Sequence, residues 1–423
     1  MPMSLIHAYS QTPSRKPVNA LIVAHFDSHG VSFAAARARV LWNRGEEVEI
    51  ISKFPETGPQ GLSSGQLKAL LDPYAPQRYE FIDIPIDVRN PDAAIKTLVD
   101  LAMIAPIYYY DHHETDVPFV PRLHHHGIYA SVFGDNVAMA AALELLTDNV
   151  AKEMAIIGMV ADRDAAVLKL TSRELVEQHY LPTANKLDVV VRNPRLVGVN
   201  TPGEFAKRWA LGEIGVAQFG SVQYPPEELA REISGRVVEE GSIAVMVDWS
   251  DQPLQHSQWT PKTLEQLLLL RGRFIAVAVV PGYNPRTHTI QGYDVRVLRY
   301  WLAPSDTPVP EEVVRDLIAQ RAISGNVVGH ADYVSIRFSS AEEARRVART
   351  VYQRIEGMQP SSVHLVNDAL VAQAIRRDFQ QILQRLTEIL ETQQRMYTEY
   401  LELKRRQVEL LEQSTEEQRR RYD

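Results

Sequence analysis

Two clusters of aspartate and histidine follow apolar, strand-length runs in the first half of the chain. One cluster occupies positions 25–30 (HFDSHG) after the run 20–24, and the other is Asp-His-His at 111–113 after the run 103–110. Mixed carboxylate and imidazole ligands suit Mn²⁺, Zn²⁺ or Fe²⁺ better than Ca²⁺. The residue types therefore predict a transition-metal site.

Two further apolar runs also end at aspartate. The run 79–82 is followed by Asp83, and the run 154–160 is followed closely by Asp162. We expect all four runs to be buried parallel strands, whose carboxyl ends face one crevice in open α/β sheets. So large a ligand set can hold two ions, an arrangement that recurs in phosphoryl chemistry. Aspartate is also a common turn former, so each position taken singly has that second interpretation.

The order of these motifs resembles that of the DHH phosphoesterase superfamily, which includes RecJ-type exonucleases, nanoRNases, cyclic-dinucleotide phosphodiesterases and inorganic pyrophosphatases. The resemblance is carried by His-x-Asp-x-x-Gly at 25–30 and Asp-His-His at 111–113. Gly329-His330 resembles the glycine–histidine motif of the DHH-associated C-terminal domain, which holds substrate over the metals. The similarity covers residues 18 to 357.

The resemblance implies a role for each matching position. His25 and Asp27 would hold a first ion, Asp83 would bridge two ions, and His112 and Asp162 would hold the second. We expect Mn²⁺, with two ions bound or only one. Because Asp87 lies four residues beyond the expected bridging aspartate, it is an alternative for that role.

The same resemblance implies catalytic and substrate-binding residues. Asp111 would orient the metal-ligating side chains without binding the metal itself, and His113 would lie close to the substrate phosphate. Gly329 and His330 would contact the phosphate or base of the substrate. An arginine is expected on a strand facing the same crevice, and Arg296 is the candidate, with Arg299 as the alternative.

Two positions depart from the pattern of the superfamily. His29 stands where a second aspartate is usual, and Phe33 stands where a small serine is usual. An imidazole can ligate a transition metal, but a neutral ligand in place of an anionic one weakens the binding of hard ions. The departure predicts a shifted metal preference and opens the possibility that one ion is lost.

These observations lead to three functional hypotheses. The first is a metal-dependent phosphohydrolase that cleaves phosphodiester bonds of short oligonucleotides or cyclic nucleotides with metal-activated water. The second is a catalytically weakened nucleotide-binding scaffold that oligomerises through a coiled coil. The third is a pyrophosphatase or single-strand exonuclease of the same superfamily.

Charge and composition narrow the partners. The chain of 423 residues has 45 Lys and Arg against 53 Asp and Glu, a formal net charge of -8. This balance lacks the overall basic surface that long duplex DNA favours, so short or cyclic nucleotides are the expected substrates. The chain has no cysteine, and neither a signal peptide nor a membrane span is apparent, so we expect a cytoplasmic protein that does not bind membranes.

The sequence predicts an α/β fold class with several parts. Residues 1–17 form a flexible lead, 18–188 a doubly wound, mostly parallel sheet domain, 189–241 a linker or hinge, and 242–357 a smaller α/β domain that binds substrate. Residues 366–423 follow as a long helix with apolar residues at heptad spacing from Ile375 to Leu410. This period is typical of a coiled coil, so we expect a homo-oligomer through residues 370–415.

Overall fold

The computed structural model describes residues 15–358, except 54–55, 59–60, 64, 254–255, 257–258 and 285–288. The chain divides into one unit that ends at Glu356 and another that begins at Gly357. Only the first unit is described below. The predicted coiled coil at 366–423 and most of the predicted lead lie outside the described residues, so the expected oligomer contacts stay predictions.

The first sheet is parallel throughout. Its strands follow the order β2 (Val48–Ile51), β1 (Lys16–Ala24), β3 (Tyr74–Ile82), β4 (Ile107–Asp111) and β5 (Tyr129–Val132). In its register Ala24 lies opposite Ile82, and Ile82 lies opposite Tyr110. The residues that come next in each strand's direction, His25, Asp83 and Asp111, are therefore brought to the same edge of the sheet.

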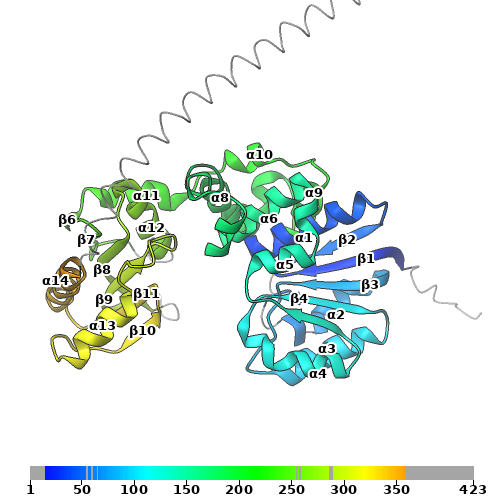
Figure 1. Cartoon of the computed structure of the whole chain (residues 1–423), viewed down its shortest axis with the longest axis horizontal. Helices are drawn as coiled ribbons and strands as arrows, with labels where there is room; N and C mark the ends of the chain where they lie inside the picture. Colours follow the sequence, from blue (N-terminus) through cyan, green and yellow to red (C-terminus); the bar gives the residue numbers. More distant parts are fainter. Residues whose placement is uncertain are drawn as a thin grey trace, which may run out of the picture. The chain divides into compact units, whose positions relative to one another are not determined.

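Helices cover both faces of this sheet (Figure 1). Ala20, Ile22 and Ala24 of β1 belong to one core, which also contains α1 (Ser28–Trp42), α6 (Asn149–Ala161), α8 (Leu181–Arg192) and α9 (Pro202–Ala210). Leu21 and Val23 belong to a second core, with α2 (Gly65–Leu71), α3 (Pro91–Ala102) and α4 (Val120–His125). Because successive strand residues point to opposite faces, the continuous apolar run of β1 fills both cores. The predicted doubly wound α/β class is confirmed.

The prediction of a strand at 154–160 is wrong. This run lies in α6, which begins after Asp148; the Asp148 side chain accepts a hydrogen bond from the Ala151 amide at 2.8 Å. All residues from Met154 to Val160 are buried because α6 packs against α1 and α8. A helix buried on all sides shows no 3.6-residue period, so its apolar run cannot be told from a buried strand. Asp162 therefore follows a helix and not a strand.

Residues 189–241, predicted as a linker, are largely helical. Besides α9 they contain α10 (Val216–Gly220) and α11 (Pro225–Ser234), and α9 packs against α1 and β2. The smaller helices of the preceding segment are α5 (Asn136–Ala142) and α7 (Arg173–Leu175). None of the described helices is long and apolar enough to cross a membrane.

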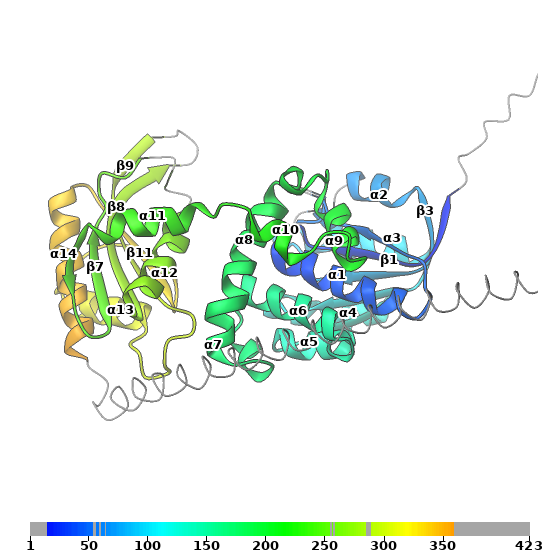
Figure 2. The same ribbon diagram turned by 90° about the horizontal axis from the view of Figure 1, so that it is seen from above.

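The second sheet is mixed. Its strands follow the order β10 (Val327–His330), β11 (Tyr333–Phe338), β9 (Thr289–Arg299), β8 (Ile275–Asn284), β7 (Ala244–Asp248) and β6 (Val237–Glu240), and only β7 and β8 pair in parallel. One face packs against α12 (Thr260–Arg271) and α11, and the other against α13 (Pro310–Ala319) and α14 (Ala341–Gly357) (Figure 2). This part of the chain has the α/β class expected for it, and the predicted domain bounds 18–188, 189–241 and 242–357 stay predictions.

Candidate metal centre

Asp83 lies at the centre of the predicted ligand set. It follows β3 directly, its side chain is 1% exposed, and its backbone adopts a φ of 62°. Its amide donates a hydrogen bond to the Tyr110 carbonyl oxygen at 2.9 Å, which holds the turn against the next strand. A left-handed conformation is uncommon for residues other than glycine, and such strain is found mainly at functional sites.

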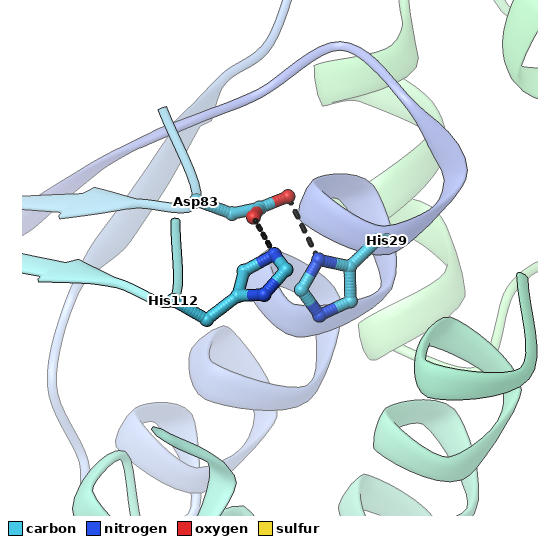
Figure 3. A group of neighbouring side chains, drawn as sticks. All are labelled: His29, Asp83 and His112. Carbon is cyan, nitrogen blue, oxygen red and sulfur yellow. Dashed lines mark ion pairs between the residues drawn. The ribbon is translucent and has the colours of Figure 1, made fainter. Parts of the chain in front are cut away.

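Three histidines surround the Asp83 carboxylate. His29 Nδ1 lies 2.9 Å from Oδ2, and His112 Nε2 lies 3.1 Å from Oδ1 (Figure 3). His113 Nδ1 is 4.0 Å from Oδ1. Among the described residues, three groups of side chains have potential ligand atoms within 4.8 Å of one another. They are His29, Asp83 and His112; His25, Asp27 and Asp83; and Asp83, Asp111 and His113, so Asp83 belongs to each. Asp83 therefore occupies the position expected of a shared ligand.

His25 and Asp27 form the second side of the cluster. His25 Nδ1 lies 2.7 Å from Asp27 Oδ2, and Asp27 Oδ1 accepts a hydrogen bond from the Gly30 amide at 2.9 Å, which caps the start of α1. A Cβ at position 30 would lie 2.7 Å from the His25 carbonyl oxygen. Glycine is therefore required where α1 begins against the histidine, which explains the His-x-Asp-x-x-Gly spacing.

The donor atoms of this cluster fit a metal ion. The Nε2 atoms of His25 and His29 are buried and lack a hydrogen-bond partner among the described residues. Leaving a buried polar atom unpaired costs free energy, and native structures rarely do so. A divalent cation with imidazole and carboxylate ligands would satisfy both nitrogen atoms, because neutral imidazole is a common metal ligand.

Asp162 reaches the cluster from the end of α6. Its Oδ2 lies 3.7 Å from His112 Nε2 and accepts a hydrogen bond from Asn136 Nδ2 at 2.9 Å. The backbone N–H of Asn136 also donates to Asp164 Oδ2 at 3.0 Å, so this one buried residue contacts both aspartates. Asn136 could not be predicted from the sequence, because an asparagine at the start of a helix looks like an ordinary capping residue.

Asp111 contacts His113, whereas the resemblance implies that it orients the metal ligands. Asp111 Oδ1 lies 2.8 Å from His113 Nδ1, and its Oδ2 accepts a hydrogen bond from the His113 amide at 3.2 Å. Behind it lies Asp116, a fully buried carboxyl that accepts hydrogen bonds from the Ile86 amide at 2.9 Å and from the Tyr109 hydroxyl. Asp116 could not be predicted from the sequence either, because it has no motif to distinguish it.

The close contacts between carboxylates and imidazoles shift several pKa values in the cluster. Burial opposes the charge of His29, but the Asp83 carboxylate outweighs it and raises the pKa of His29 to about 10. Burial is likewise outweighed at His113, where Asp111 raises the pKa to about 9. Asp83 itself is held well below its usual pKa by His29 and His112, in spite of its burial. Without metal the imidazoles of His29 and His113 thus carry protons, so metal binding at His29 competes with protonation.

The two departures from the superfamily pattern touch each other. The rings of His29 and Phe33 meet edge to face with centroids 4.3 Å apart, one turn from each other on α1. Phe33 in turn lies against Gly158 of α6, where a Cβ would come within 3.2 Å of the phenylalanine ring. The phenylalanine fits because α6 has a glycine at this position, and it fixes the imidazole that replaces the expected aspartate.

Asp87 and the two arginines expected near the substrate pair with residues outside this cluster. Asp87 belongs to none of the three groups and pairs with Arg89 at 3.2 Å. Arg296 lies on β9 beside Asp294 at 3.4 Å, and Arg299 pairs with Asp332 at 2.9 Å. Gly329 and His330 form the end of β10. These partners of the two arginines are not among the ligands of the cluster, so the substrate roles expected on the second sheet stay predictions.

The comparisons with known proteins come from structure alone, because no family model and no curated protein matches the chain. One similar structure is the DHH domain of a member of a family of ribosomal proteins, at 14% identity and a TM-score of 0.43, covering 82% of this chain and 88% of that one. RecJ from Thermus thermophilus in complex with Mn²⁺ is similar at 16% identity and a TM-score of 0.38, covering 81% of this chain.

The chain spans about half of RecJ, 52% of its length. The RecJ structure in complex with Mg²⁺ matches at 14% identity and a TM-score of 0.34, over 81% of this chain and 49% of that one. The solved structures that the chain matches thus include a DHH domain, from the superfamily that its motif order resembles. Likeness of this degree assigns no activity, so the functional argument rests on the geometry of the cluster.

Proposed function

We propose that the chain is a metal-dependent phosphohydrolase that cleaves phosphodiester bonds of short oligonucleotides or cyclic nucleotides. The observation that carries the proposal is Asp83, a buried carboxylate shared by three groups of potential ligands at the carboxyl edge of a parallel sheet. Ligands of open α/β folds bind at this edge. The resemblance of the motifs to the DHH superfamily supports the same reaction class.

The residues of the cluster have distinct tasks in this proposal. His25, Asp27, His29, Asp83, His112 and Asp162 would hold Mn²⁺, as one or two ions. When bound, the metal would supply water of lowered pKa and positive charge against the phosphate. Asp111 fixes the orientation of His113 through Nδ1 at 2.8 Å. His113 is more exposed than the aspartates behind it, with 36% of its side chain accessible, so it is the residue placed to contact a substrate phosphate.

The proposal is tested by hydrolysis of a substrate panel in Mn²⁺. The panel contains a linear dinucleotide, a five-residue RNA, cyclic dinucleotides, larger cyclic oligonucleotides and pyrophosphate. We expect one nucleotide class to be cleaved, and Asp83→Asn to lose that activity. Asp87→Asn is the matched control, because it removes a carboxylate four residues away that is outside the cluster. Cleavage of pyrophosphate alone would favour the pyrophosphatase alternative, and equal activity in Asp83→Asn would refute the metal mechanism.

One observation favours a second candidate, the nucleotide-binding scaffold. The imidazole of His29 pairs directly with the Asp83 carboxylate at 2.9 Å and neutralises it without a metal. A cluster that is satisfied by its own protons can persist as a structural feature. Absence of turnover for every substrate, together with retained nucleotide binding and no metal in the purified protein, would favour the scaffold.

A further inference from the structure

Two half-buried charges outside the ligand set adjoin the segments that carry the ligands. Arg163 follows Asp162 directly in the chain. Asp188 of α8 accepts a hydrogen bond from the hydroxyl of Ser28 at 3.3 Å, and Ser28 stands between Asp27 and His29. Each of these charges has its partner on α12, which carries none of the predicted ligands.

Arg163 is fixed at every polar atom of its guanidinium. Its Nε and Nη2 donate to the two carboxylate oxygens of Glu265 at 2.7 and 2.6 Å. Nη1 donates to the Val160 carbonyl oxygen at 2.7 Å, and Nη2 also donates to Asn185 Oδ1 at 2.8 Å. The backbone of Arg163 has a φ of 61°, which turns the chain sharply after Asp162. A bidentate arginine–carboxylate pair adds geometric precision as well as energy, so Glu265 holds this turn.

Asp188 is fixed in the same way by the opposite charge. Lys262 Nζ forms an ion pair with Asp188 Oδ2, and Arg192 Nε lies 3.3 Å from the same oxygen. Lys262 and Glu265 are three residues apart on α12 and therefore project from the same side of that helix. Helix α12 thus pairs Lys262 with Asp188 and Glu265 with Arg163. Both partners adjoin segments that carry predicted ligands.

Burial raises the free-energy cost of separating these charges from their partners. Glu265 is 6% exposed. Burial disfavours the charged form of Arg163, but the Glu265 carboxylate outweighs it and raises the pKa of the arginine. At Lys262 burial prevails and lowers the pKa although Asp188 lies beside it. Removing Glu265 leaves the Arg163 guanidinium without its carboxylate partner, and removing Lys262 leaves Asp188 with Arg192 but without the lysine, so each remaining charge is drawn toward water. The segment that carries the charge, and the ligand next to it, would move as well.

We propose that Glu265 and Lys262 are positioning residues for the metal centre, with Glu265 acting through Arg163 on Asp162 and Lys262 acting through Asp188 and Ser28 on Asp27 and His29. The inference rests on the proposed metal binding at the cluster and extends it to a helix of the second sheet. It makes metal affinity dependent on α12, which carries no predicted ligand.

The test compares Mn²⁺ affinity by calorimetry in full-length Glu265→Gln, Lys262→Met and Lys262→Arg variants. Loss of residues that orient metal ligands typically weakens metal affinity about 10-fold to 100-fold. We expect a loss of about that size in Glu265→Gln and Lys262→Met and affinity close to wild type in Lys262→Arg, which keeps the charge. Asp294→Asn is the matched control, because Asp294 is 2% exposed and pairs with both Nε and Nη2 of Arg337, far from the ligands in sequence.

Circular dichroism and thermal unfolding show whether a variant that binds Mn²⁺ weakly is still folded. If Glu265→Gln fails to fold, the comparison of Lys262→Met with Lys262→Arg tests the proposal. Unchanged Mn²⁺ affinity in folded Glu265→Gln and Lys262→Met, with affinity lost in Asp83→Asn, would overturn this inference alone. An equal loss in Asp294→Asn would also overturn it, because general destabilisation would then explain the effect. A wild-type chain that binds no Mn²⁺ would instead refute the proposed function.

Discussion

At the scale of single residues, the motifs predicted the side chains that the strand register brings to one edge of the sheet, but not the residues that only packing brings beside them. His25, Asp27, Asp83 and Asp111 follow apolar runs, and the register of the strands places them at one edge. Asn136 and Asp116 carry no such mark. Asn136 is recognisable only because α5 brings its amide 2.9 Å from Asp162. Contacts of this kind depend on how helices pack, so they produce no characteristic residue spacing in the sequence.

His29 sets the metal preference in the proposed site, and its replacement gives a first prediction. In His29→Asp a carboxylate takes the place of a buried imidazole beside Asp83. Carboxylates suit Mg²⁺, whereas imidazole suits transition metals. We expect Mg²⁺ affinity to rise and the preference for Mn²⁺ over Mg²⁺ to fall by about tenfold or more, which is about 1.4 kcal/mol. Calorimetric titration with both ions measures it.

The control for this variant is His126→Asp, which makes the same change of residue type on an exposed surface position. It should leave both affinities unchanged. If His29→Asp kept the wild-type ratio of Mn²⁺ to Mg²⁺ affinity, His29 would not be a metal ligand.

Asp116 gives a second prediction at this scale. Burial and the neighbouring Asp111 raise the pKa of Asp116 to about 7, above its unfolded value, so the folded chain holds this proton more tightly than the unfolded chain. Stability from this group is fully present below the unfolded pKa and is lost as the pH rises through about 7. Between pH 6 and 8 the metal-free wild type should lose about 1.4 kcal/mol that Asp116→Asn, a mimic of the protonated acid, does not lose.

Urea unfolding of metal-free protein at pH 6 and pH 8 measures this difference. Both chains share all other titrating groups. Asp116 also helps to raise the pKa of His113 to about 9, which lies above this pH range, so the difference between the two pH dependences reports mainly Asp116. Parallel pH profiles for the two proteins would show that the carboxyl is already ionised at pH 6.

At the scale of elements, the apolar runs located the ends of strands and failed where burial is complete. The runs 20–24 and 79–82 end β1 and β3 as expected, and the run 103–110 overlaps β4. The run 154–160 is equally apolar, but it forms α6. Its residues are buried on every side, and neither period nor polarity distinguishes the two structures. The predicted place of Asp162 beside the other candidate ligands did not depend on this error, because Asp162 follows the segment whether it is a strand or a helix.

The contact between α1 and α6 gives a prediction about this element. A Cβ at Gly158 would lie 2.8 Å from Ser32 Cβ and 3.2 Å from the Phe33 ring. Overpacking costs about 1–3 kcal/mol, and alanine favours a helix over glycine by about 1 kcal/mol. Gly158→Ala should therefore lower the free energy of unfolding by up to about 2 kcal/mol and disturb His29 through Phe33.

Urea unfolding and Mn²⁺ titration measure the two effects. Gly134→Ala is the control, because Gly134 is exposed and a Cβ there would meet no atom within 4 Å. A Gly158→Ala protein as stable as wild type would mean that α6 can shift away from α1 at little cost.

At the scale of the whole molecule, composition and alternation of apolar runs sufficed for the α/β class, and the register of the first sheet explains why distant motifs meet. The pairing of Glu265 with Arg163 joins positions 102 residues apart. Such a pair has no signal in a single sequence, because each member looks like an ordinary helix or turn charge. The sequence also left open the mixed pairing of the second sheet, since strand direction follows from how the connections cross.

The last prediction concerns the segment beyond the described residues. Ile375, Ile382, Ile389, Met396, Leu403 and Leu410 recur every seven residues, a spacing that favours association of helices. We expect a chain ending at Met358 to have the mass of a monomer by light scattering, and the full chain to have a multiple of it. Because the ligands of the proposed metal centre all lie before residue 163, the shortened chain should keep the Mn²⁺ affinity of the full chain. A shortened chain with the same oligomer number would place the contacts between subunits elsewhere, and a loss of Mn²⁺ affinity on shortening would make assembly a requirement of the metal centre itself.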